Sequence, residues 1–186
     1  MTQNTLNIVR LADLKPTPWK NGGGITRDIA AARDGAGLLW RLSMADVDRD
    51  GDFSSFAGLT RVLTVIEGSG MILHGPSGGV AADFAAPVTF EGGAAVRAEL
   101  TQGPIRDFNL MFDTARYDGS AVRVAGGPLD LGGAGQIAVL HLITGGATIG
   151  AHAMAPGDTA ICEGSALNAT LAEDACALAI TLAPRP

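Results

Sequence analysis

Short runs in which apolar and polar residues alternate follow one another along most of the chain, and turn residues separate them. In residues 38–45 every second side chain is apolar, so that Trp40, Leu42 and Met44 fall on one face of an extended strand. Residues 61–66 form an almost wholly apolar run, which is typical of a buried strand. Helical periodicity is weak throughout. The pattern therefore predicts an all-β protein, either a sandwich or a barrel.

The densest group of glycine and polar residues lies at 18–29, with the sequence Pro-Trp-Lys-Asn-Gly-Gly-Gly-Ile-Thr-Arg-Asp-Ile. Three consecutive glycines cost backbone entropy, and they are expected where the chain needs a positive φ or a close backbone approach. An alternating strand follows them. We therefore expect a glycine loop that delivers polar side chains to the mouth of a sheet. On composition alone, a plain hairpin turn with Trp19 as its apolar plug stays open.

Composition and charge exclude several classes of protein. The 186 residues allow one domain, or two small ones that share a core. The formal charge of −6 and the lack of a basic stripe argue against nucleic-acid binding. No polybasic, long apolar or signal-like segment indicates a membrane or secretion, so we expect a cytoplasmic protein. We expect Cys162 and Cys176 to be reduced core thiols, and whether they face each other stays open.

The candidate chemistry is a set of cations, amides and hydroxyls on expected strands. The glycine triplet at 22–24 lacks the features of a phosphate loop. An arginine fork binds a carboxylate, whereas an amide can donate or accept. A pocket with such groups and aromatic walls suits a small anion that carries an amide or planar group. The candidate ligand-binding residues are Trp19, Lys20, Asn21, Thr26, Arg41, Phe53, Phe56, Arg61, Asp107 and Asn109.

A structural role for the same side chains also stays open. Arg41, Arg61 and Asp107 would then form a buried ion-pair network that holds strands together. Asn21 and Asn109 would only satisfy backbone groups of loops.

Several stretches of the sequence resemble the HutD/Ves family, whose members are small proteins linked to bacterial histidine utilisation. The 18–29 stretch quoted above resembles the family signature, and so does Trp-Arg-Leu-Ser-Met-Ala-Asp-Val at 40–47. Further matching stretches lie at 51–61, 68–71, 90–92 and 103–111. The later part of the chain is similar only as a cupin-like sheet.

This resemblance implies a double cupin, an all-β fold with two β-barrel halves in one chain. A weak internal repeat supports it, since Val-Leu-Thr-Val-Ile-Glu-Gly at 62–68 is similar to Val-Leu-His-Leu-Ile-Thr-Gly at 139–145. We expect a first cupin half at residues 1–115 that carries the ligand pocket and a connector at 116–136. The second half would span 137–186 and be closed by N-terminal strands.

The histidines do not match the metal-binding pattern of cupins, which uses a His-x-His pair, a following glutamate and a later histidine. The chain has only His74, His141 and His152, and none lies two residues from another. Because a catalytic metal needs at least three well-placed ligands, we expect no metal and no other cofactor.

The resemblance implies that the pocket binds a small carboxylate from histidine breakdown, such as urocanate or a formylated glutamate, and that it senses or limits flux through that pathway. Lys20 and Arg61 would hold the anion, Asn21 and Asn109 would orient it, and Asp107 would fix Arg61 or accept from the ligand. Two alternatives stay open. One is a metal-independent isomerase or hydrolase with Lys20 or Asp107 as acid or base. The other is a scaffold for a protein partner, with an exposed apolar patch. A homodimer is compatible with each of these.

Overall fold

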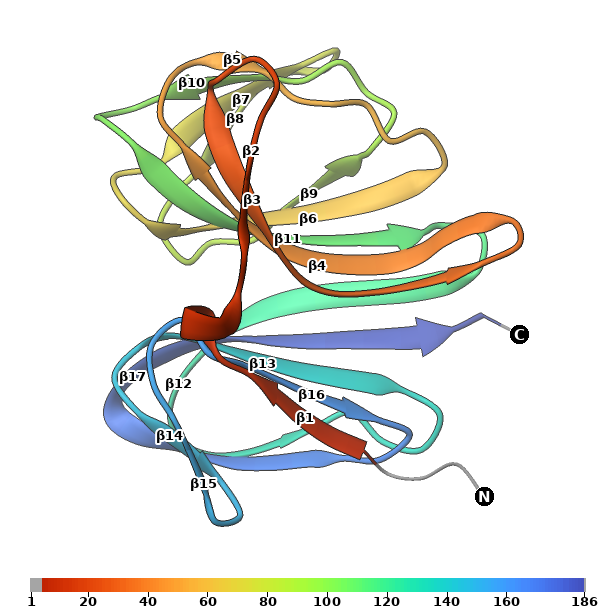
Figure 1. Cartoon of the computed structure of the whole chain (residues 1–186), viewed down its shortest axis with the longest axis vertical. Helices are drawn as coiled ribbons and strands as arrows, with labels where there is room; N and C mark the ends of the chain where they lie inside the picture. Colours follow the sequence, from red (N-terminus) through yellow and green to blue (C-terminus); the bar gives the residue numbers. More distant parts are fainter. Residues whose placement is uncertain (1–4, 186) are drawn as a thin grey trace. The chain divides into compact units, whose positions relative to one another are not determined.

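The computed structural model describes residues 5–185, and nearly all of their regular structure is β-strand (Figure 1). This confirms the predicted all-β class. The chain divides into two compact units. We call residues 15–116 the pocket unit, and residues 5–14 together with 117–185 the terminal unit. Within the described part of the chain, no helix is long and apolar enough to cross a membrane.

Two antiparallel sheets form the pocket unit. The six-stranded sheet has the order β2 (Pro16–Pro18), β3 (Gly24–Asp34), β4 (Gly37–Val47), β11 (Ile105–Asp113), β6 (Leu59–Glu67) and β9 (Val88–Glu91). The four-stranded sheet has the order β5 (Gly51–Asp52), β10 (Arg97–Leu100), β7 (Met71–Gly75) and β8 (Gly78–Ala82).

Strand register decides which side chains share the inner face of the pocket unit. Asp107 of β11 lies opposite both Ala45 of β4 and Val65 of β6, and these side chains point to the same side of the sheet. Near this point the inner face is apolar and belongs to one buried cluster with residues of the smaller sheet. Further along β11, Met111 lies between Arg41 and Arg61, so the same face becomes polar.

The terminal unit is one sheet that curls on itself. Its order is β1 (Thr5–Val9), β16 (Thr159–Glu163), β13 (Ile137–Thr144), β17 (Leu167–Pro184), β14 (Ala147–Ile149) and β15 (His152–Met154), and β12 (Tyr117–Leu131) pairs with β17 off this path. Small and branched apolar side chains fill its core. Residues 5–14 belong to this unit, because β1 pairs with β16.

The expected connector at 116–136 is mostly strand, which corrects that prediction. The 15-residue strand β12 pairs with β17 almost from end to end, with a bulge between Ala125 and Gly127. Its glycines and half-exposed side chains resemble those of a loop. The long partner strand, more than 35 residues later in the chain, supplies the hydrogen bonds that local composition cannot reveal.

The two units pair their strands in the same way. In the pocket unit, β6 lies between β9 and β11, and β11 also pairs with β4. In the terminal unit, β13 lies between β16 and β17, and β17 also pairs with β12. The repeated segments 62–68 and 139–145 fall largely in the equivalent strands β6 and β13. The sequence repeat therefore corresponds to a repeat of strand pairing.

Both cysteines are buried and free. Cys162 lies on β16 opposite Ala138 of β13, whereas Cys176 lies on β17 opposite Thr144 of the same strand. The prediction of two core thiols is confirmed, and they are too far apart along β13 to face each other.

Asp158, in the turn before β16, holds the N-terminal segment onto the terminal unit. Its carboxylate accepts from Arg10 Nη1 at 2.6 Å, from the Leu11 backbone at 3.3 Å and from the Ala155 backbone at 2.9 Å. Asp158 is only 5% exposed. Because its removal leaves these donors without their acceptor, we expect Asp158→Ala to lower the free energy of unfolding by about 2–3 kcal/mol, measured by urea denaturation.

Asp118→Ala is the matched control for this measurement. Asp118 belongs to the same unit but pairs with Arg185 at the surface, where ion pairs contribute little. Equal losses of stability in the two variants would contradict the role given to Asp158.

Candidate ligand-binding site

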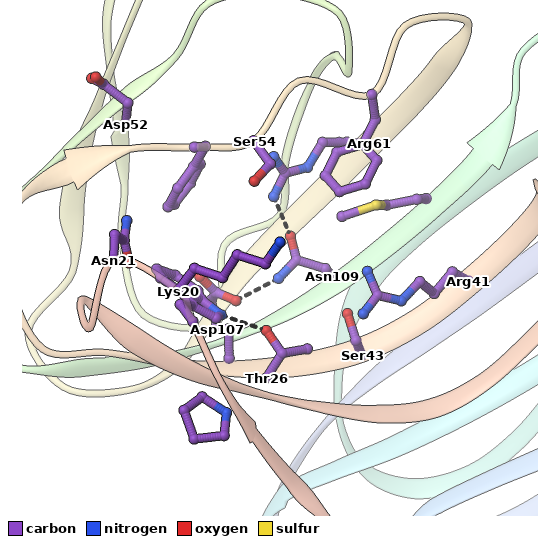
Figure 2. A pocket seen from close by; sticks show the side chains of 16 residues that line it. Lys20, Asn21, Thr26, Arg41, Ser43, Asp52, Ser54, Arg61, Asp107 and Asn109 are labelled. Atoms are coloured by element: carbon purple, nitrogen blue, oxygen red, sulfur yellow. Dashed lines mark hydrogen bonds between the residues drawn. The ribbon is translucent and has the colours of Figure 1, made fainter.

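One end of the pocket unit opens into a cavity of about 440 Å³ (Figure 2), a size that suits a small metabolite. All ten residues that the sequence predicts for a ligand site line it. It is also lined by six residues that the prediction did not include, which are Pro18, Ser43, Ala45, Asp52, Ser54 and Met111. Strand alternation alone would have found Ser43, Ala45 and Met111, since they share a face with predicted residues.

The glycine loop forms a tight turn between β2 and β3. The Trp19 backbone N–H donates to Gly24 O at 2.9 Å, and the Gly22 N–H donates to Trp19 O at 3.0 Å. Gly22 has a φ of 68°, and a Cβ added at Gly24 would lie 2.3 Å from Asp46 O. Positive φ and close approach, the two reasons expected for the glycines, therefore both occur.

This loop places three polar or aromatic side chains at the cavity. Trp19 donates from its indole Nε1 to Thr26 Oγ1 at 2.7 Å, which fixes the ring on the wall. Lys20 is exposed and extends its ammonium group into the cavity (Figure 2). Asn21 has a structural role as well, because its Oδ1 accepts from the Gly23 N–H at 3.0 Å.

Arg61 is buried in a cage of phenylalanine rings. Its guanidinium carbon lies 5.1 Å from the centroid of Phe53, 5.6 Å from that of Phe56 and 5.0 Å from that of Phe90. The residue is 5% exposed, and its Nε makes no hydrogen bond within residues 5–185. Burial lowers the pKa of Arg61 to about 10, and the charge of Asp107 opposes this shift. The side chain therefore stays cationic at neutral pH with an unused donor, and a buried unused donor is costly.

Asp107 and Arg61 are connected through Asn109 and form no direct ion pair. Asn109 Oδ1 accepts from Arg61 Nη2 at 2.8 Å, while Asn109 Nδ2 donates to Asp107 Oδ1 (Figure 2). Asp107 is 1% exposed, and burial raises its pKa to about 7, although the charge of Arg61 acts in the opposite direction. The expectation that Asp107 fixes Arg61 is thus met only indirectly, through the amide that orients both groups.

The expected alternative, an ion-pair network of Arg41, Arg61 and Asp107, is absent among the described residues. Arg41 instead donates from Nε to Asp28 Oδ1 of the neighbouring strand β3 at 2.6 Å. Arg41 therefore lines the cavity while it pairs with the neighbouring strand, and it is not part of a network with Arg61 and Asp107.

A network that does pin strands lies on the opposite face of the same sheet. Asp46 of β4 accepts from Arg27 Nη1 of β3 at 2.6 Å and also from Arg106 Nε of β11. Arg106 donates in addition to Glu67 of β6 at 2.6 Å. This network joins β3, β4, β6 and β11 without Arg61 or Asp107.

No metal-ligand cluster forms in the described range. Nowhere in residues 5–185 do three or more His, Cys, Asp or Glu side chains gather in a way that could hold an ion. His74 pairs with Glu99 at 2.8 Å, and His141 is buried with its Nδ1 2.9 Å from Thr159 Oγ1.

Comparison with known proteins identifies the family. The HutD family model matches residues 11–179. The chain belongs to the HutD family. Among curated relatives, an uncharacterized 21.2 kDa protein in the hutC 3' region of Pseudomonas putida is 43% identical over 118 residues, which is 60% of either protein. Protein Ves of Citrobacter koseri is 36% identical over 122 residues, covering 61% of this chain and 62% of Ves. Each match thus spans about three-fifths of the length of these two curated relatives.

Solved structures match over almost the whole chain. HutD from Pseudomonas fluorescens SBW25 is 34% identical with a TM-score of 0.86, covering 98% of this chain and 100% of that one. A conserved protein of unknown function from Pseudomonas aeruginosa PAO1 is 33% identical with a TM-score of 0.85, covering 96% and 99%. Bacterial pirin YhhW from Escherichia coli, solved with nickel(II), has a TM-score of 0.70 at 7% identity over 98% and 100%, which shows the fold alone. This HutD-family chain therefore has a cupin-type β fold.

Proposed function

We propose that this HutD-family protein is a bicupin that works without a metal ion and binds a small carboxylate metabolite. Arg61 carries the proposal. It is a buried cation with an unused Nε donor, and it lines a cavity of suitable size. The phenylalanine rings and Asn109 compensate the burial of this cation only in part, because its Nε donor has no acceptor. A carboxylate would supply that acceptor and a negative charge.

The strand pairing supports two cupin halves. The pocket unit and the terminal unit repeat the same order of neighbours around β6 and β13. We assign the ligand to the pocket unit, because the equivalent face of the terminal unit, around β13, belongs to an apolar cluster.

The surroundings of Arg61 define the chemistry of the ligand. Lys20 adds a second cation from the glycine loop, and the Asn109 amide fixes the position of the guanidinium. Trp19 and the phenylalanines offer flat apolar walls. A short anion with a planar group, such as urocanate or N-formyl-L-glutamate, matches these features.

The names of relatives support a role near histidine utilisation. One relative is described by its place beside hutC, and a solved structure is described as HutD. We infer a cytoplasmic sensor that binds a pathway carboxylate and limits flux through the pathway.

Isothermal titration calorimetry of the wild-type protein tests this proposal. We expect saturable binding of urocanate or N-formyl-L-glutamate, and much weaker binding of the matching uncharged amide, because the amide lacks the charge that Arg61 and Lys20 require. Proton NMR of the same mixtures should show unchanged ligand after overnight incubation. Absence of binding by both acids, or equal binding of acid and amide, would contradict the proposed function.

An enzyme acting on the same class of acid is the second candidate, and one observation favours it. Asp107 is a buried cavity carboxyl whose pKa burial raises to about 7, which is the range of an effective general acid or base. Product formation in the NMR experiment that disappears in Asp107→Asn would favour this candidate over a binding protein.

A further inference from the structure

Asp107 is held by neutral groups only. Asn109 Nδ2 donates to its Oδ1, and the backbone amide of Ala45 is the other hydrogen-bonding group beside it. No lysine, arginine or histidine forms an ion pair with it within residues 5–185, although it is 1% exposed and lines the cavity. Burial without a direct ion pair disfavours the ionised form of this carboxyl group.

Charged groups around Asp107 come from every neighbouring element of the pocket unit. Arg61 of β6 acts on it across Asn109, and its positive charge favours ionisation. The negative charge of Asp46 of β4, on the other face of the sheet, disfavours ionisation. The remaining charged residues that line the cavity are Lys20 of the glycine loop, Arg41 of β4 and Asp52 of β5.

A bound anion would change this balance. A carboxylate ligand at Arg61 and Lys20 would bring a second negative charge into the cavity that Asp107 lines, and it would neutralise the cation that favours ionisation. Two carboxylates repel each other strongly where burial lowers the effective dielectric constant, as it does around the 1% exposed Asp107. Protonation of Asp107 removes the repulsion, and it gives the cavity a hydroxyl donor while the other oxygen keeps accepting from Asn109.

We propose, on the basis of the proposed function, that Asp107 is the specificity-determining residue of the pocket. As a neutral carboxylic acid it donates its proton to an oxygen of the anionic ligand. Where Asp107 is ionised in the free protein, each binding event therefore takes up one proton from the solvent, and apart from this proton transfer no covalent bond changes. The ligand class is an anion with an oxygen acceptor beside Asp107, which the protonated carboxyl binds and the ionised carboxylate repels.

Because binding requires protonated Asp107, the affinity for the ligand should fall as the pH rises. Burial raises the pKa of Asp107 to about 7 in the empty pocket, and a bound anion raises it further. Affinity should thus be constant below about pH 6 and should fall by up to about tenfold per pH unit above pH 7. The carboxyl groups of N-formyl-L-glutamate stay ionised over this range, so they do not contribute to the slope.

The test is calorimetry of N-formyl-L-glutamate, and of urocanate above pH 7.5, in buffers of different ionisation enthalpy. At pH 8 we expect the wild-type protein to take up close to one proton per ligand, and at pH 5.5 N-formyl-L-glutamate should bind without uptake. The Asp107→Asn side chain keeps a hydrogen-bond donor but cannot titrate. This variant should bind the ligand at pH 8 at least as tightly as the wild type. Its binding should take up no proton, and its affinity should not change with pH.

Asp52→Asn is the matched control. Asp52 lines the same cavity, but its side chain is 83% exposed. Its loss should shift affinity equally at all pH values and leave proton uptake unchanged. Wild-type binding without proton uptake at pH 8, or a pH slope that survives in a folded Asp107→Asn protein, would overturn the inference while the proposed function stands. No binding of either acid by the wild type would overturn both.

Discussion

Replacing Arg61 with methionine should weaken carboxylate binding by about 30-fold or more, because truncating a buried charge partner in a binding site costs about 2–5 kcal/mol. The phenylalanine cage should tolerate the change, since a thioether packs well against aromatic rings. Loss of the nearby positive charge leaves Asp107 more readily protonated, so no ionised carboxylate is stranded. Calorimetry gives the affinity, and a thermal melt within a few degrees of the wild type confirms that the protein is folded.

Arg116→Met is the control for this experiment. Arg116 belongs to the same unit, but its side chain is 42% exposed, it pairs with Asp34, and neither residue lines the cavity. We expect unchanged affinity. A folded Arg61→Met protein with wild-type affinity would contradict the proposed site.

Replacing Gly24 with alanine should disrupt the fold of the glycine loop and the pocket together. The new Cβ would lie 2.3 Å from Asp46 O and 3.1 Å from the Trp19 ring, so the start of β3 must move away from β4. Overpacking of this kind costs about 3 kcal/mol, which corresponds to a fall in melting temperature of about 6–12 °C. Differential scanning calorimetry measures the shift, and ligand affinity should fall with it.

Gly35→Ala provides the comparison, because a Cβ at Gly35 meets nothing within 4 Å and its φ is not positive. Its melting temperature should stay close to that of the wild type. If the two alanine variants melt at the same temperature, the close packing described for Gly24 is wrong.

Local alternation was enough to predict much of the candidate site. The alternation expected for residues 38–45 is found in β4, where Arg41 and Ser43 lie on the face opposite Trp40, Leu42 and Met44 and line the cavity with Asp107 and Asn109 of β11. The glycine loop could also be predicted, because positive φ and tight packing leave few other residues. Family resemblance then favoured a ligand-binding role for the whole group over a structural one.

The other contacts and elements could not be predicted, because they depend on pairing between strands that are distant in the sequence. Phe90 completes the cage only because β9 pairs with β6 and places it opposite Arg61. The ion pairs of Asp46 depend in the same way on two strands that lie far apart in the chain. The strand β12 was missed for the same reason, since its partner β17 begins 36 residues after β12 ends. Pairings of this kind are set by the tertiary fold and leave no local signal.

Lys20 and Arg61 differ in solvent exposure. We therefore expect Lys20 to act mainly on the rate of ligand association and Arg61 mainly on the rate of dissociation. Lys20 is exposed at the mouth, whereas Arg61 lies beneath the aromatic rings. Dissolved salt screens the first charge far more than the second. Rising ionic strength should therefore slow the arrival of a carboxylate and barely change its residence time, so that the pocket keeps its ligand in a crowded, salty medium.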